Sequence, residues 1–214
     1  MITWLINGRN QATETRTKTN GNGSSDIAMI RTLLSFLVVF SGALPAIADV
    51  TVLEDRIEWY DVTGATLNEV RQSLRERSPA KPYDAEAKWW IDWRYRWMND
   101  ATACRLTQVT VMLRVVTTFP RLAPDAPAPA DLRRSWQSYS DRLMVHERGH
   151  ARIGADAAEQ IDQRLKTISI EGNCDNMEAT ANEAAMELIR QANQADKDYD
   201  RRTNHGATQG ASLK

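Results

Sequence analysis

Apolar and polar residues alternate through the first half of the folded region, which is the pattern of half-buried strands. The clearest alternating segment, 89–97, places four aromatic residues and one isoleucine on one face. A second segment runs from Cys104 to Thr118, and the turn residues Asn99-Asp100 between the two predict an antiparallel pair. An earlier segment, 49–62, predicts one or two further strands. This half of the chain is therefore expected to form a sheet.

Two local signals divide the chain around these strands. Thr66-Leu67-Asn68-Glu69 is a capping box, and it predicts a short helix that ends before Ser78-Pro79. The segment 120–130 holds four of the seven prolines and predicts irregular structure. We expect this segment to connect the sheet half to a helical half.

Beyond the connector the apolar spacing becomes helical. From Asp131, the expected N-cap, apolar residues recur every three or four positions as far as Ile168 and predict one long helix. A second helix is predicted from Cys174 to about Asn193, and a polar tail, 194–214, follows it. Together these elements predict an α+β fold, in which a small antiparallel sheet packs on the long helix and on a second, C-terminal helix.

The N-terminal region has the pattern of a secretory signal peptide. A cationic start at 29–31, an apolar run and the ending Ala46-Ile47-Ala48 predict a signal peptide over 29–48. The apolar run is shorter than the about 20 residues that a membrane span needs, so we expect no span after cleavage. Residues 1–28 are then an extension ahead of the true start, and 49–214 form a single domain. The expected location is periplasmic or secreted.

Export changes the interpretation of the two cysteines, Cys104 and Cys174. In an oxidising compartment they predict a disulfide between the sheet half and the last helix, whereas the alternative is two buried thiols. A bridge that closes a loop of roughly 70 residues would stabilise the fold by about 4 kcal/mol in the loop-entropy model.

The charge of the chain does not favour nucleic acid as a partner. The formal net charge is −1, and acidic and basic residues are mixed along the chain rather than gathered in blocks. Neither observation favours binding to nucleic acid or to an anionic membrane surface. We expect no nucleic-acid partner.

One short motif carries the candidate chemistry. His146-Glu147-Arg148-Gly149-His150 matches H-E-x-x-H, and it contains two of the three histidines of the chain. Residues four apart on a helix lie on one face, so His146 and His150 can bind one Zn²⁺ while Glu147 accepts a proton from water. Both histidines lie on the inward stripe of the predicted helix. A metal-free pair that packs in the core is the alternative, but two unpartnered imidazoles would be costly to bury.

Catalytic zinc needs a third protein ligand, and the residues leave several open. His205 is the remaining histidine and lies in the polar tail. Glu183 or Glu187 on the last helix would give two histidines and a downstream glutamate. Asp156 occupies the third-ligand position of the metzincin pattern, but Gly154 lies one place too late for that pattern, and a continuous helix would turn Asp156 away.

Taken together, these residues resemble a bacterial family called domain of unknown function 922, which is described as predicted secreted zinc-dependent proteases. The resemblance rests on the segments 90–93 and 136–150, on the two cysteines, and on 199–206, which is similar to the family's Y-D-x-x-T-x-H-G signature. It implies a zinc protease, and it favours His205 over the other candidates for the third ligand. It implies nothing about the substrate.

The predicted function is that of a zinc peptidase acting on a peptide or protein. Glu147 is the expected general base, and it returns the proton to the leaving amine. Tyr199 or His205 is a candidate to stabilise the oxyanion, and Asp200 is a candidate to orient a ligand histidine. Two alternatives stay open: a non-proteolytic zinc amide hydrolase of the cell wall, and an envelope binding module with structural zinc. The oligomeric state is left open.

Overall fold

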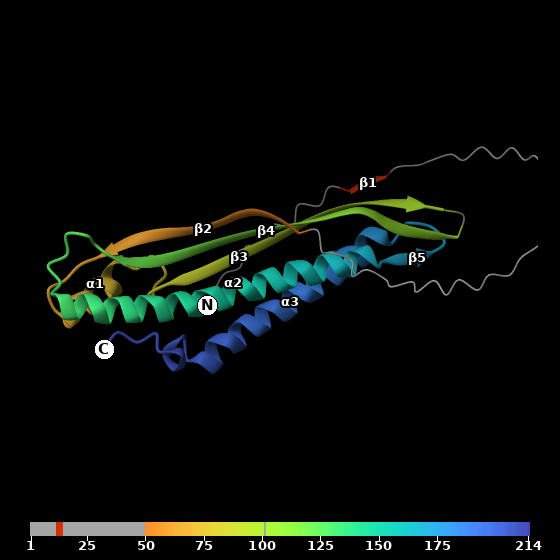
Figure 1. Ribbon diagram of the computed structural model, residues 1–214. Coiled ribbons are helices and arrows are strands. Elements are labelled where there is room, and N and C mark those ends of the chain that lie inside the picture. Colours follow the sequence, from red (N-terminus) through yellow and green to blue (C-terminus); the bar gives the residue numbers. More distant parts are fainter. Residues whose placement is uncertain (1–11, 15–49, 101) are drawn as a thin grey trace, which may run out of the picture.

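The computed structural model describes residues 12–14, 50–100 and 102–214 (Figure 1). The signal peptide predicted over 29–48 lies outside the described residues, as does most of the extension before it. The elements in chain order are β1 (Ala12–Glu14), β2 (Val50–Val62), α1 (Leu67–Arg77), β3 (Glu86–Asn99), β4 (Ala103–Leu122), α2 (Ala130–Lys166), β5 (Ser169–Glu171), α3 (Met177–Thr203) and the 3₁₀ turn η1 (Ala207–Gln209).

The strands form one sheet in the order β1-β3-β4-β2, with the short β5 also paired to β4. The predicted antiparallel pair is confirmed: β3 and β4 pair with Trp89 opposite Val115 and Ile91 opposite Leu113. In contrast, β2 lies parallel to β4, so the sheet is mixed rather than wholly antiparallel. The reason is that α1 and the following loop carry the chain across β4 before β3 begins. The predicted α+β class is confirmed.

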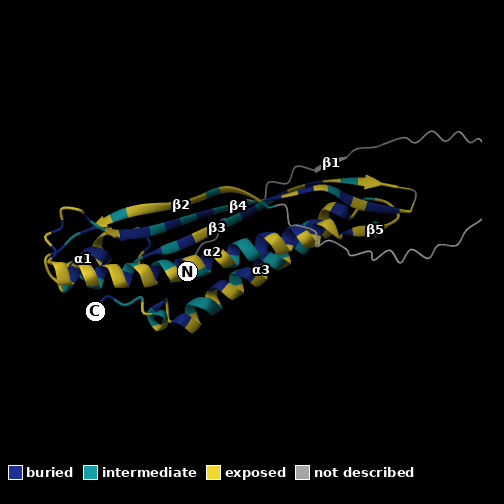
Figure 2. Ribbon diagram, viewed as in Figure 1, coloured by how far each residue is buried: buried dark blue, intermediate teal, exposed yellow. Residues whose placement is uncertain are grey.

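The molecule has two layers, with the helices on one face of the sheet (Figure 1). α2 lies along the sheet and α3 packs beside α2. Alternate residues of β3 and β4 are buried and pack against residues of α2 and α3. Figure 2 colours the buried positions of the ribbon dark blue. Burial of a large apolar side chain contributes roughly 1.5–3 kcal/mol, so this layer is the main source of stability. Its members on the sheet include Trp89, Ile91, Trp93, Tyr95, Leu106, Val109, Val111, Leu113 and Val115.

α2 has 37 residues and is therefore about 55 Å long. It begins two residues earlier than predicted: Pro129 occupies the N-cap position, and Asp131 lies in the first turn. Pro129 holds the extended backbone that a helix entry needs, while an acidic residue in the first turn interacts favourably with the helix dipole. Within the residues that the structure describes, no helix has both the length and the apolar composition needed to cross a membrane.

α3 departs most from the prediction, because it continues ten residues past Asn193 and ends at Thr203. The inward stripe of the helix continues through this extension, but with polar residues. Asp196 and Thr203 are buried at 6% and 8% exposure, although neither is apolar. A search for apolar periodicity therefore ends too early, at the point where the stripe changes from packing to polar contacts.

The predicted disulfide between Cys104 and Cys174 is present, with 5.3 Å between the two Cα atoms. Cys104 lies in β4, and Cys174 lies three residues before α3. The bridge therefore ties the start of α3 to the sheet.

Replacing both cysteines by alanine is expected to lower the free energy of unfolding by about 2–4 kcal/mol, because the bridge closes a loop across a sequence separation of 70 residues. The measurement is the midpoint of urea unfolding, compared with wild type under oxidising and reducing conditions. A midpoint that does not change between the double variant and oxidised wild type would contradict a stabilising role.

Candidate metal centre

The middle of α2 carries the motif histidines on its buried face. His146 and His150 are 4% and 7% exposed, and their rings lie edge to face. Their Nε2 atoms are 3.2 Å apart. Since the two residues are one helical turn apart, α2 alone brings these two nitrogen atoms together.

Asp200 of α3 supplies a third donor atom at the same point. Its Oδ1 lies 3.2 Å from Nε2 of His146 and 3.1 Å from Nε2 of His150. Donor atoms of these three residues all lie within 4.8 Å of one another. Ligands at about 2.0–2.1 Å from a tetrahedral ion are about 3.3–3.4 Å apart, so the three separations fit one metal ion.

Each histidine is oriented by a hydrogen bond on its other nitrogen. Nδ1 of His150 donates to Oδ1 of Asp196 at 2.8 Å, and Nδ1 of His146 donates to Oε1 of Gln209 at 3.0 Å. This arrangement places the proton on Nδ1 and leaves the lone pair of Nε2 for a metal. Asp196 and Asp200 are themselves four residues apart, so α3 presents both aspartates to the histidines of α2.

Tyr199 packs against His146 and holds its ring in place. Its ring stacks on the imidazole at 5.1 Å, and its hydroxyl donates to the backbone carbonyl of His146 at 3.2 Å. Gln209 in turn donates to the Tyr199 hydroxyl at 3.0 Å. A Cβ atom at Gly149 would lie 2.1 Å from that hydroxyl oxygen, so only glycine fits at this position of the motif. Tyr199 is thus placed to position His146 rather than to contact an oxyanion.

Glu147 lies beside the three donors without joining them. Its side chain is buried, and Oε2 accepts a hydrogen bond from the backbone N–H of Ala87 at 2.8 Å. Burial raises the pKa of this carboxyl to about 7, although the neighbouring His150 and His146 oppose the shift. β3 thus fixes the carboxylate next to the candidate metal position.

The two ligand types perturb each other strongly in the metal-free protein. Burial alone would lower the pKa of His150, but hydrogen bonds from its ring to Asp196 and Asp200 outweigh burial and raise that pKa to about 10. Burial would raise the pKa of Asp200, yet its hydrogen bonds with His146 and His150 lower it well below its usual range. These contacts thus favour the charged forms of both His150 and Asp200.

His205 lies at the edge of this cluster. Its Nδ1 is 3.4 Å from Oδ1 of Asp200 and its side chain is 48% exposed. Its ring packs against Tyr83 at a centroid distance of 5.0 Å, with the two planes tilted by 33°. It is not one of the three residues whose donor atoms converge. The structure therefore brings Asp200 into the position for which the sequence favoured His205.

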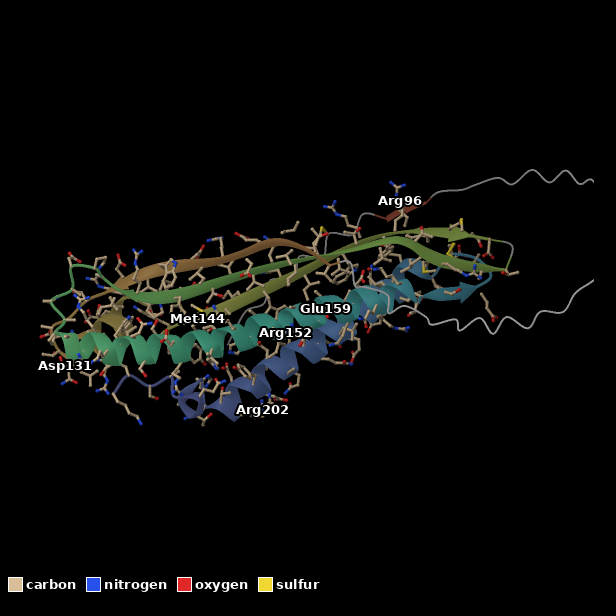
Figure 3. All side chains as sticks on the ribbon, viewed as in Figure 1. Arg96, Asp131, Met144, Arg152, Glu159 and Arg202 are labelled. Atoms are coloured by element: carbon tan, nitrogen blue, oxygen red, sulfur yellow. A yellow bond between two sulfur atoms is a disulfide. The ribbon has the colours of Figure 1, made fainter. Side chains whose placement is uncertain are left out.

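The other candidates for a third ligand point elsewhere. Glu183 and Glu187 are exposed and both bind Arg190. Glu183 precedes Asp196, which contacts His150, by 13 residues, or about 20 Å along α3. It therefore lies far from the motif histidines. Asp156 binds Arg152, which Figure 3 labels on α2. Because α2 continues without a break, Asp156 is turned away from the histidines, as the helical pattern indicated.

The cluster opens onto a pocket of about 230 Å³. One wall is formed by six consecutive residues, 82–87, which lead into β3. The opposite wall is formed by α2, by the end of α3 and by the tail. The lining side chains include Tyr83, Asp84, Glu86, Tyr139, Leu143, His146, Glu147, His150, Asp200 and His205.

Sequence reasoning missed Asp196 and Gln209, and it assigned Asp200 to orientation only. A signal for the aspartates was present, because Asp196 and Asp200 have the same i, i+4 spacing as His146 and His150. Two such pairs on neighbouring antiparallel helices form a four-residue cluster. No comparable pattern points to Gln209, which a turn brings beside His146.

The family resemblance is borne out by comparison with known proteins. The family described as "Bacterial protein of unknown function (DUF922)" matches residues 57–206. The chain belongs to this family. No curated protein and no solved structure matches the chain. The matched region holds β3, β4, both cysteines and the three converging donors, whereas Gln209 follows it.

Asp196→Asn is expected to weaken zinc binding by about 10–100-fold, because the amide orients His150 less strongly than a carboxylate. Asp198→Asn is the matched control, since Asp198 lies on the same helix but binds Arg201 at the surface. Zinc affinity measured by competition with a chelating dye checks the prediction. Equal affinities for the two variants would contradict it.

Proposed function

We propose that the protein is an exported zinc-dependent peptidase whose metal is held by His146, His150 and Asp200. The observation that carries the proposal is the convergence of two buried histidines and the half-buried Asp200 beside Glu147, in the lining of a pocket. Two imidazoles and one carboxylate are a donor set that suits zinc, and catalytic zinc sites keep a fourth position open.

The alternative of a structural zinc is less well supported. A structural site is closed by four protein ligands, whereas donor atoms of three of the described residues converge here. A structural site also has no need of a carboxylate beside the metal or of a pocket above it. Hydrolysis of a cell-wall amide uses the same chemistry as peptide hydrolysis, so the choice of substrate decides between those two functions.

In the proposed reaction, bound zinc would supply a Lewis acid and a water of lowered pKa. Glu147 accepts a proton from the attacking water as the water oxygen forms a bond to the carbonyl carbon. The carbon–nitrogen bond then breaks, and Glu147 gives the proton to the leaving nitrogen. The Ala87 N–H holds the carboxylate in place for both transfers.

The proposed location outside the cytoplasm rests on two features. One is the signal-peptide pattern at 29–48, and the other is the Cys104–Cys174 disulfide. Structural disulfides persist in oxidising compartments and are rare in the cytosol.

Glu147→Gln is expected to retain zinc and to lose peptide hydrolysis by a factor of at least about 100, because the amide accepts no proton. The substrate is an unfolded protein such as reduced, carboxymethylated casein, with fragments followed by mass spectrometry. Bound zinc is quantified in the same samples. Hydrolysis by the variant at the wild-type rate would contradict the assignment of Glu147 as the general base. A zinc-loaded wild-type protein that cleaves no substrate would contradict peptidase activity.

Substitution of Asp200 and of His205 separates the two candidates for the third ligand. Asp200→Ala is expected to weaken zinc binding by about 100-fold or more, whereas His205→Ala should change it less than about threefold. The increase in thermal melting temperature on adding zinc gives a second measurement, since a ligand that binds the folded state stabilises it. The opposite ranking would restore His205 as the ligand.

A further inference from the structure

The wall of the pocket carries more negative charge than the candidate metal requires. Its charged lining residues, histidines aside, are Asp84, Glu86, Glu147 and Asp200, and all four are acidic. No lysine or arginine is among the described residues that line it. We therefore ask which positive group balances the charge of each carboxylate.

Three of the four have a positive partner in the metal-loaded protein. A divalent cation would balance the charges of Asp200 and Glu147. Glu86 forms an ion pair with Lys88, with Oε2 at 2.9 Å from Nζ. Among the described residues, no side-chain nitrogen of lysine, arginine or histidine lies within 4 Å of a carboxylate oxygen of Asp84. It is left as the carboxylate whose charge a ligand would have to balance.

Asp84 is also held in one position. Its Oδ2 accepts a hydrogen bond from the hydroxyl of Tyr139 at 2.6 Å, and its backbone carbonyl accepts one from Tyr60. Tyr139 is only 3% exposed and lies on α2, two turns before His146. A carboxylate held by the hydroxyl of the buried Tyr139 needs little further ordering when it binds a cation.

The position of Asp84 relates it to the reaction centre. Asp84 precedes Ala87 by three residues, and three residues of extended chain span at most about 11 Å. The N–H of Ala87 touches Glu147. A lysine or arginine side chain one or two residues from a bond attacked beside Glu147 can reach across such a distance.

We propose that Asp84 is a specificity-determining residue that selects substrates with a cationic group near the cleaved bond. The inference rests on the proposed peptidase function and names its substrate class. Lysine and arginine side chains, and a free N-terminal amine, share the required chemistry. Because a hydrogen bond between charged groups is stronger than one between neutral groups, the preference over a neutral analogue is roughly tenfold or more.

Binding tests this inference independently of hydrolysis. The probes are fluorescent octapeptide mixtures with a fixed central lysine or a fixed central ε-acetyllysine, each with a free or an acetylated N-terminus. They are titrated into zinc-loaded Glu147→Gln protein, with and without the further change Asp84→Asn. Asparagine keeps the size of the side chain and an oxygen that accepts from Tyr139. Glu86→Gln is the matched control, because Glu86 lines the same wall but is paired with Lys88.

The expected result is that the lysine mixture binds at least tenfold more tightly than the acetyllysine mixture. Asp84→Asn should abolish that ratio, and Glu86→Gln should keep it. If only acetylation of the N-terminus matters, the recognised cation is the amine. Equal binding of all four mixtures, or a ratio that Asp84→Asn leaves unchanged, would overturn the inference. Melting temperature and zinc content verify that each variant is folded and loaded.

Hydrolysis of the same mixtures by the zinc-loaded parent protein keeps the two proposals apart. A lysine preference in binding without any cleavage would contradict the peptidase function but support Asp84 as the cation-binding residue. Cleavage without a lysine preference would support the peptidase function and contradict the role of Asp84.

Discussion

The site depends on how two antiparallel helices present i, i+4 pairs to each other. α2 carries His146 and His150, and α3 carries Asp196 and Asp200. One aspartate orients a histidine through Nδ1, while the other joins both histidines at Nε2. If either helix rotated by one residue, about 100°, these contacts would be lost. The register between α2 and α3 is therefore the constraint that the candidate centre requires.

Features outside the donor set hold this register. The disulfide ties the start of α3 to β4, and the aromatic face of β3 fixes α2 against the sheet. Two glycines of α2 let neighbours approach closely: a Cβ at Gly154 would lie 2.5 Å from the Trp89 ring, and one at Gly149 would meet Tyr199. The small residues of α2 thus place the sheet on one side and α3 on another, with the histidines between them.

Sequence patterns predicted the parts of this structure that repeat. Period-2 aromatics identified β3, helical spacing identified α2, and the motif identified His146, Glu147 and His150. The end of α3 was missed because its buried stripe becomes polar, and Asp200 was therefore assigned to a tail rather than to a helix. The parallel placement of β2 and the contact between Gln209 and His146 depend on how distant segments meet. Local periodicity carries no information about such contacts.

The burial of so many ionisable groups argues for the metal on energetic grounds. His146, Glu147, His150 and Asp196 are each less than 10% exposed. The two histidines and Asp196 meet between α2 and α3, and Glu147 faces β3. Buried charges cost several kcal/mol each unless they are paired, and apolar residues of similar size would stabilise the same interface better. Farther along α2 the buried face is mainly apolar, as at Ala157 and Ile161, although Asp162 is also buried there and pairs with Lys166. His146, Glu147 and His150 lie where α2 lines the pocket, and cation binding there would offset the stability that these polar residues cost.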